Sequence, residues 1–216
     1  MKNGIKYLVA GLVATGLAVS SSYAVITVSY TAAGSSYVTD STGAANYLSG
    51  DLVEIGAFTG TPTVGSPSLA NFTVFSSTIT GSGPLAGSYA GGSTADAGAF
   101  SHAQIYLVVF NQATANVVPG TTQLAIADVA FASDPAWKFP ANADIPNTTA
   151  FDLDELFNGG TVGTLGTGAT VYWGSTGTDG GSYNLLQTVV VPVPEPSTYV
   201  LVGTGLLGLL GLRRRS

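Results

Sequence analysis

Short apolar runs, each about as long as one β-strand, recur along residues 25–191 and are separated by clusters rich in Gly, Ser, Thr and Pro. The runs "AVITVSYT" and "DLVEIGAF" alternate with a period of two, which is typical of a half-buried strand. Clusters such as "TGTPTVGSPS" are composed of residues that favour turns and loops. No long amphipathic helical pattern interrupts this order. We therefore predict an all-β fold.

Later runs extend this pattern. The most apolar one, "AQIYLVVFN", predicts a central strand buried on both faces, and "TQLAIADVAF" predicts its partner after the turn "VPGT". The run "NFTVFSSTIT" predicts a strand with Phe72, Val74 and Ser76 on one face. Three shorter strands are expected at "AWKFP", "ATVYWG" and "NLLQTVVV".

The spacing of these runs predicts one β-sandwich domain over residues 25–191, either jelly-roll or immunoglobulin-like. One segment departs from the strand pattern. In "TTAFDLDELFNGG" we expect Thr148 or Thr149 to cap a short helical turn that ends at Asn158-Gly159.

Charge is scarce and unevenly placed. Only 8% of residues are charged, against about 25% in ordinary soluble domains. Residues 25–193 contain one lysine, Lys138, no arginine and eleven of the twelve acidic residues, a net charge of −10. Such a surface repels phosphate backbones, so nucleic-acid binding is not expected. The chain has no cysteine, which excludes disulfides, thiolate metal sites and cysteine nucleophiles.

The first 24 residues have the pattern of a secretory signal peptide for the Sec machinery. Lys2 and Lys6 form a positive region, and residues 7–19 form an uncharged apolar run. Ser22 and Ala24 place small side chains where a signal peptidase reads them, so we expect cleavage after Ala24. A retained anchor is the alternative, but 13 residues are fewer than the roughly 20 that a stable span needs.

The C-terminal end has a second apolar segment, residues 199–212, after a Pro-rich linker at residues 192–198. As a helix this segment would measure about 21 Å, less than the roughly 30 Å of a hydrocarbon core, so it is a marginal transmembrane helix. The basic tail at residues 213–216 should stay cytoplasmic, as should the positive N-terminal region. Everything between them is then expected outside the membrane.

The motif Pro194-Glu195-Pro196, the apolar segment and the cluster Arg213, Arg214 and Arg215 occur in this order within the last 23 residues. This arrangement resembles the PEP-CTERM sorting signal of exported bacterial proteins. The resemblance implies processing by exosortase, a transient inner-membrane anchor and a final place at the cell surface or in the extracellular matrix. It also implies association with extracellular polysaccharide. A plain tail anchor behind a Pro-rich linker is the alternative. The segments "DLVEIGAF", "IYLVVFN" and "WKFP" also resemble ectodomains that accompany this signal, which bears on architecture alone.

Sugar binding would need exposed aromatic rings beside polar groups. Tyr172, Trp173 and Tyr183 form the candidate group, beside Gly174 and Asp179 in the sequence, and Tyr172 and Trp173 are the leading pair. The alternative is that these rings fill the core, as we expect for Trp137 and for Trp173.

A calcium site is a weaker hypothesis. Asp152, Asp154 and Glu155 lie close together in "FDLDELFNGG" and offer the oxygen ligands that calcium prefers. The segment lacks the glycine and the final glutamate of an EF-hand loop. The same acids are equally compatible with the first turn of a helix, where its dipole favours negative charge. We therefore predict no metal and no other cofactor.

Catalytic groups are sparse. His102 is the sole histidine, and Ser101 and Asp96 lie near it in sequence without forming a recognisable triad. A pair of carboxylates for glycoside hydrolysis would come from Asp51, Glu54, Asp128 and Asp134, but no spacing marks a pair.

These patterns favour a non-enzymatic exported surface or matrix protein, with exosortase and the Sec machinery as partners and extracellular polysaccharide as a possible one. A lectin-like carbohydrate-binding module is the alternative, and a secreted glycoside-acting enzyme is third.

Overall fold

The computed structural model describes residues 25–32, 34–43, 46–144, 146–157 and 162–193. Short strands dominate this part of the chain, which confirms the predicted all-β class. The strands are β1 (Val25–Ala32), β2 (Ser36–Thr39), β3 (Leu52–Phe58), β4 (Phe72–Ile79), β5 (Tyr89–Asp96), β6 (Tyr106–Phe110), β7 (Gln123–Val129), β8 (Thr148–Asp152), β9 (Ala169–Trp173), β10 (Ser175–Asp179), β11 (Tyr183–Gln187) and β12 (Val189–Val190). Short 3-10 helices lie between some of them: η1 (Gly83–Leu85), η2 (Gly98–Phe100), η3 (Pro135–Trp137) and η4 (Leu153–Leu156).

The largest sheet has the order β12-β7-β6-β3-β4, and β9 also pairs with β7. Its central strand is β6, in which all five residues are buried, as the run "AQIYLVVFN" predicts. Strand β7 is the antiparallel partner of β6, with Leu107 opposite Ala127, which confirms the expected pairing. A strand with apolar side chains on both faces is stable only where other side chains pack on both faces, and each face of the large sheet carries a core.

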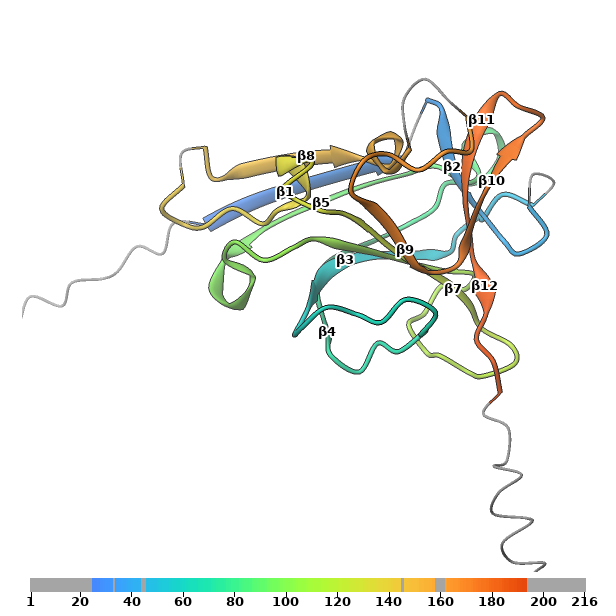
Figure 1. Ribbon diagram of the computed structural model, residues 1–216, viewed down its shortest axis with the longest axis horizontal. Coiled ribbons are helices and arrows are strands. Elements are labelled where there is room, and N and C mark those ends of the chain that lie inside the picture. The colour runs from blue at the N-terminus through green and yellow to red at the C-terminus, as the bar shows by residue number, and fades with distance from the viewer. Residues whose placement is uncertain (1–24, 33, 44–45, 145, 158–161, 194–216) are drawn as a thin grey trace, which may run out of the picture.

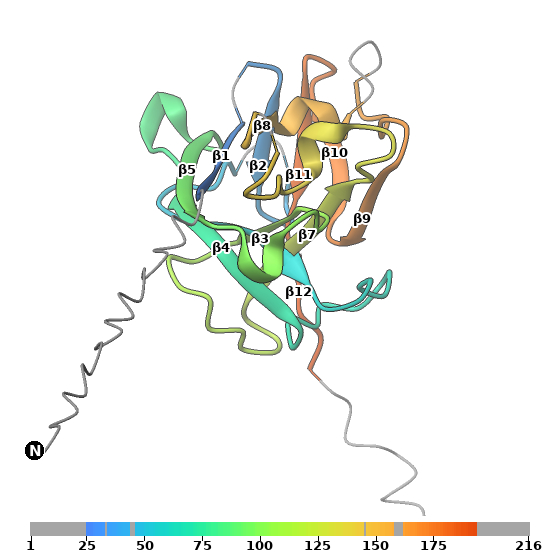
Figure 2. The ribbon, with the colours of Figure 1, turned by 90° about the vertical axis from the view of Figure 1, so that its left-hand side faces the viewer.

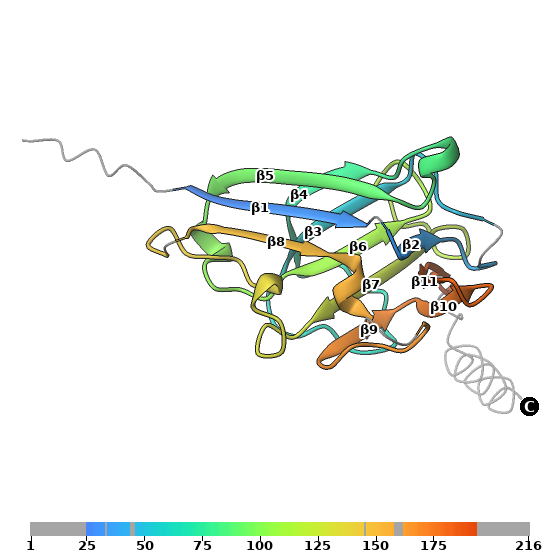
Figure 3. The ribbon, with the colours of Figure 1, turned by 90° about the horizontal axis from the view of Figure 1, so that it is seen from above.

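One face of this sheet is covered by the three-stranded sheet β5-β1-β8 (Figures 1 and 3). Strand β1 pairs antiparallel with β5 and parallel with β8, although β8 lies more than 100 residues later in the chain. Alternate residues of β1, among them Ile26, Val28 and Tyr30, are fully buried against Val53 and Ile55 of β3 and their neighbours. This packing forms the main core.

The other face of the large sheet carries a smaller core. Its buried side chains come from β6, β7 and β9 and from the residue that follows β12. They are Tyr106, Val108, Phe110, Leu124, Ile126, Tyr172 and Val191. On the side away from the large sheet, this smaller core is covered, within the described residues, by loops and not by another sheet. The amide of Gly65, in the loop between β3 and β4, donates to the carbonyl of Tyr172 at 2.7 Å and so holds that loop against β9.

A third sheet, β10-β11-β2, stands at one end of the molecule (Figures 1 and 3), which is the end farthest from the viewer in Figure 2. Strand β11 pairs parallel with β2, so that Leu185 lies opposite Tyr37 and Leu186 opposite Val38. Val38 and Leu186 point into the main core. Because strand side chains alternate, Tyr37 and Leu185 lie on the opposite face of this sheet, where Tyr37 is partly exposed and Leu185 is fully buried.

Strand β4 departs from its predicted face. The register between β3 and β4 shifts between Ile55 and Gly56, which skips one residue of β4 and forms a bulge. Phe72 therefore packs on the smaller core, whereas Ser76 accepts a hydrogen bond from the Tyr30 hydroxyl in the main core. Gly56 permits this approach, since a Cβ there would lie 2.1 Å from the Thr73 carbonyl oxygen. The prediction of one shared face for Phe72, Val74 and Ser76 is wrong.

Two short segments also differ from expectation. Thr148 and Thr149 lie in strand β8, and the turn that follows is the 3-10 helix η4, capped by Asp152 rather than by a threonine. This segment forms a strand because it pairs in parallel with the edge of β1, and its Phe151 is buried in the core. The predicted strand "AWKFP" begins as η3, with Pro135 near its start and the side chain of Asp134 as its cap. Trp137 within it is fully buried, as predicted.

Candidate functional site

The predicted sugar-binding pair lies in β9. Tyr172 is 8% exposed and packs on Tyr106 with ring centroids 5.7 Å apart. Trp173 packs against the same smaller core, and its Nε1 donates to the carbonyl of Val189 at 3.1 Å. Both side chains pack in or against the smaller core, and this packing counts against Tyr172 and Trp173 as an exposed platform for a sugar.

The Tyr172 hydroxyl donates to Oδ2 of Asp128 at 3.3 Å. Asp128 is 4% exposed, and no donor among the described residues reaches its Oδ1. Burial raises the pKa of this carboxyl to about 7, because the charged form loses its hydration, and the Tyr172 hydroxyl offsets part of the effect. The signal for this site in the sequence is one acid inside the apolar run "AIADVAF".

Three other tyrosines form a partly exposed group on the outer face of the third sheet. We call Tyr37, Tyr47 and Tyr183 the tyrosine row. The ring of Tyr37 meets Tyr47 edge to face at 5.4 Å and meets Tyr183 in the same way at 5.2 Å. Tyr183 is 39% exposed, and the other two rings are partly buried. Sequence reasoning missed Tyr37 and Tyr47, because Tyr37 reaches Tyr183 only through the parallel pairing of β2 with β11, and Tyr47 joins the row only through Tyr37.

An open hollow of ≈ 540 Å³ adjoins this row, with Tyr47 as part of its wall. Its size is within the roughly 300–1,000 Å³ typical of ligand pockets. Polar side chains from separate loops line most of the rest: Asp40, Asn46, Ser49, Asp51 and Asn111. Burial raises the pKa of Asp51, and the Ser49 amide, which donates to its Oδ2 at 2.8 Å, opposes that rise.

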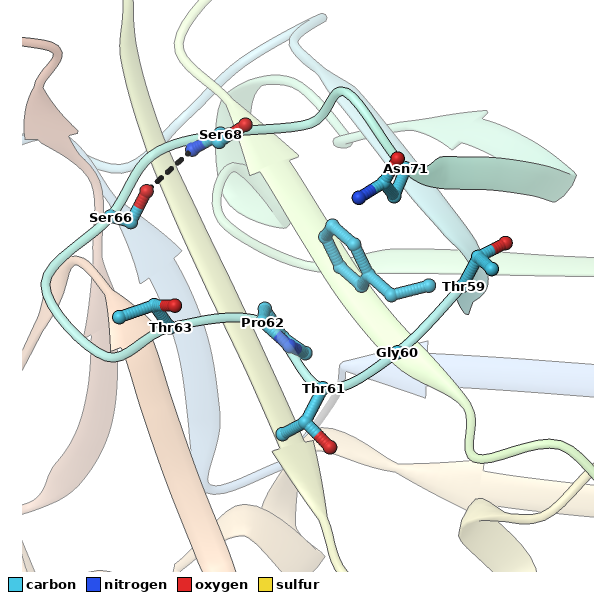
Figure 4. Close-up of a pocket in the computed structure, with 9 residues that line it drawn as sticks. Thr59, Gly60, Thr61, Pro62, Thr63, Ser66, Ser68 and Asn71 are labelled. Atoms are coloured by element: carbon cyan, nitrogen blue, oxygen red, sulfur yellow. Dashed lines mark hydrogen bonds between the residues drawn. The ribbon is translucent and has the colours of Figure 1, made fainter.

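A second hollow lies in the loop between β3 and β4, beside Phe58 (Figure 4). Hydroxyl and amide side chains line it, and Ser68 donates its backbone amide to the Ser66 hydroxyl at 3.4 Å. Its volume of ≈ 140 Å³ is below the usual range for a ligand pocket, so we give it no role.

The three acids of the calcium hypothesis have separate protein partners. Asp152 accepts from Thr31, and Asp154 accepts from the Ser35 hydroxyl at 2.8 Å. Glu155 accepts from Nε1 of Trp137 at 2.8 Å. Within the described ranges, no group of three or more histidine or acidic side chains has the spacing of a metal site. The acids therefore act as local hydrogen-bond acceptors.

His102 pairs with Asp144 and not with its sequence neighbours. Its Nε2 lies 3.0 Å from the Asp144 carboxylate, and its side chain is 52% exposed. Asp96 instead accepts from Asn142 at 2.9 Å. Hydrogen bonds of the Ala141 amide and of His102 lower the pKa of Asp144. Throughout the described part of the chain, no hydrogen bond joins His102 to Ser101, so the predicted neighbours do not form a triad.

The four candidate glycosidase acids are also dispersed. Asp51 lines the open hollow, and Asp128 belongs to the smaller core. Glu54 is buried in β3, which raises its pKa, and Asp134 accepts from the Ala136 amide at 2.9 Å as the cap of η3. Each acid belongs to a different local structure.

The predicted sorting residues lie outside the described residues, as do Ser22 and Ala24 and the apolar segment 199–212. Among the helices that are described, none is long and apolar enough to cross a membrane.

Comparison with known proteins adds the evidence for the C-terminal end. No curated protein matches this chain, and no solved structure matches it either. Residues 192–215 do match a family, the PEP-CTERM protein-sorting motif. This range contains Pro194-Glu195-Pro196 and the three arginines, which confirms the resemblance seen in the sequence. The chain therefore carries a PEP-CTERM protein-sorting motif and is an exported protein of the kind that exosortase processes.

Proposed function

We propose that this protein is a non-enzymatic component of the cell surface or extracellular matrix that associates with extracellular polysaccharide. The observation that carries the proposal is the sorting motif at residues 192–215. It belongs to exported proteins that exosortase handles at the membrane, and extracellular polymer is what such a domain meets after export. The two facing sheets support a β-sandwich for the exported domain, without favouring jelly-roll or immunoglobulin-like topology.

The non-enzymatic part of the proposal is supported by the partners of the candidate acids. Among the four candidate glycosidase acids, Asp134 accepts from the Ala136 amide, Asp128 accepts from Tyr172 in the smaller core, and Glu54 is buried in β3. A hydrolase needs two carboxyl groups aimed at one bond across a groove. These carboxylates are spread over separate structural contacts instead.

The sorting step is tested by the intact mass of the exported protein in a bacterium that has exosortase and in the same strain without it. We expect a mature chain that begins at Val25 and ends near Pro194-Glu195-Pro196. Replacing these three motif residues by alanine should leave the longer form at the membrane, whereas the control Pro119→Ala, at an exposed proline outside the matched range, should be processed normally. A mature protein that keeps all three arginines would contradict the proposal.

A second candidate, a carbohydrate-binding module, is favoured by the tyrosine row and the hollow beside it. This candidate keeps the sorting route and replaces passive residence in the matrix by specific binding.

A further inference from the structure

The tyrosine row is held in place before any ligand arrives. The Tyr47 hydroxyl donates to the Asp179 carboxylate, and the Tyr37 hydroxyl donates to the carbonyl of Gly34 at 3.3 Å. Burial and the negative charge of Asp179 raise the pKa of Tyr47 to about 12, so its hydroxyl keeps its proton. Rings that are already fixed lose little conformational entropy on binding.

The position of Tyr47 depends on a close contact with the backbone. Gly87 has a φ of 78°, and a Cβ on it would lie 2.6 Å from Cδ1 of Tyr47. The ring therefore lies directly on the glycine backbone. The Tyr47 ring also contacts Tyr37, which contacts Tyr183, so three separate segments contribute to one continuous set of rings: β2, the loop after it and the β10–β11 hairpin.

The hollow adds hydrogen-bonding groups to these rings. Oδ1 of Asp40 accepts from Thr42, and Oδ2 of Asp51 accepts from the Ser49 amide. Among the described residues, no donor reaches the second oxygen of either carboxylate. Asn111 uses its Oδ1 to accept from the Gln123 amide at 2.7 Å, which leaves its amide hydrogens as donors beside the hollow.

We propose that the tyrosine row and the adjoining hollow bind a neutral polysaccharide chain. The apolar C–H faces of successive sugar rings would pack on Tyr183 and Tyr37, and sugar hydroxyls would donate to Asp40 and Asp51 in the hollow. A row of rings followed by a polar hollow suits an extended, polyhydroxylated polymer.

The charge around the site selects against acidic polymers. Asp40, Asp51 and Asp179 all belong to the site or support it. Residues 25–193 carry eleven acids against one lysine, Lys138, so the domain repels uronate, sulfate and phosphate groups. A neutral sugar has no such penalty, and its hydroxyls match carboxylate acceptors.

This inference rests on the proposed function, because the polymer is available only to an exported protein. The test uses the processed protein and the extracellular polysaccharide of its own bacterium, separated by anion exchange into an unretained neutral fraction and a retained acidic fraction. Affinity electrophoresis against each fraction measures binding. We expect retardation by the neutral fraction, at low and at high salt alike, since no ion pair contributes.

Variants locate the site. Tyr183→Ala should weaken binding to the neutral fraction about tenfold or more, as loss of a central aromatic contact does. Tyr183→Trp should keep it, since it restores a flat ring. The matched control is Phe131→Ala, which removes an aromatic ring of similar exposure, 42%, elsewhere on the surface and should leave binding unchanged.

Three outcomes would overturn the inference: binding to the acidic fraction alone, binding to neither fraction, or an equal loss of binding in Phe131→Ala. The intact mass separates these failures from failure of the proposed function. A chain cut at the sorting motif that binds neither fraction rejects this site but leaves the sorting route standing.

Discussion

Two tyrosines of this domain donate their hydroxyl to an aspartate, in opposite surroundings. The pair Tyr172–Asp128 lies in the smaller core, where both residues are less than a tenth exposed. The pair Tyr47–Asp179 lies on the outer face of the third sheet, beside an open hollow. The same chemical contact therefore serves two purposes. In the core it pairs a carboxyl that has lost its hydration, whereas on the surface it fixes a ring that ligands can reach.

The contrast between the two pairs separates the aromatic residues of the core from those available for binding. Tyr172 and Trp173 are adjacent in sequence and look like a sugar-binding pair, but their rings close the loop-covered side of the large sheet. Tyr37, Tyr47 and Tyr183 are scattered in sequence and meet on the surface. Breaking each pair in turn should separate stability from binding.

The largest effect is expected from Tyr172→Ala. Removing a buried aromatic ring costs about 3–5 kcal/mol, through lost burial and the cavity that remains. Chemical denaturation of the purified exported protein measures the loss. Tyr183→Ala, on the exposed side of the comparison, should change the free energy of unfolding by about 0.5 kcal/mol or less. Equal destabilisation by both variants would show that the tyrosine row is part of the core.

The next effect concerns pH. The pKa of Asp128 is about 7 in the folded protein, against an ordinary value of 3.8. Between about pH 4 and pH 7 the folded state therefore binds more protons than the unfolded state, so the stability that protonated Asp128 allows is lost as pH rises through this window. The shift corresponds to a loss on the order of 4 kcal/mol by pH 8.

Asp128→Asn should abolish this part of the pH dependence, because the amide stays neutral and still accepts from Tyr172. Denaturation at about pH 4 and pH 8 should show a higher free energy of unfolding for the variant than for the native chain only at the higher pH. Burial also raises the pKa values of Glu54 and Glu155, so a weaker slope of the same sign remains in the variant. Parallel stability curves for the two proteins would refute a raised pKa at Asp128.

A smaller loss of stability than at Tyr172 or Asp128 is expected from Tyr47→Phe. This variant keeps the ring and removes the hydrogen bond to Asp179, so it should cost about 1 kcal/mol of stability. Binding to the neutral polysaccharide fraction should weaken less than in Tyr183→Ala, since the ring remains but is less firmly held. If Tyr47→Phe bound the polysaccharide more weakly than Tyr183→Ala does, the Tyr47 hydroxyl itself would contact the ligand.

Several features follow directly from local sequence. Continuous apolar runs predict β6 and β7 as buried neighbours, because a strand with apolar residues on both faces must lie inside a sheet. The order of the Pro-Glu-Pro motif, apolar segment and arginines is enough to recognise the sorting motif, since the signal is read as linear sequence.

Local sequence was enough to predict the all-β class, the central strands, the burial of Trp137 and the sorting motif, because alternation, apolar runs and linear motifs act over a few residues. Long-range packing sets the bulge opposite Gly56, the pairing of residues 148–152 with β1 as strand β8, and the partners of each tyrosine and aspartate. These depend on pairings such as β2 with β11, which join residues about 150 positions apart. Local patterns carry no information on such distant contacts, and the candidate binding surface is made of them.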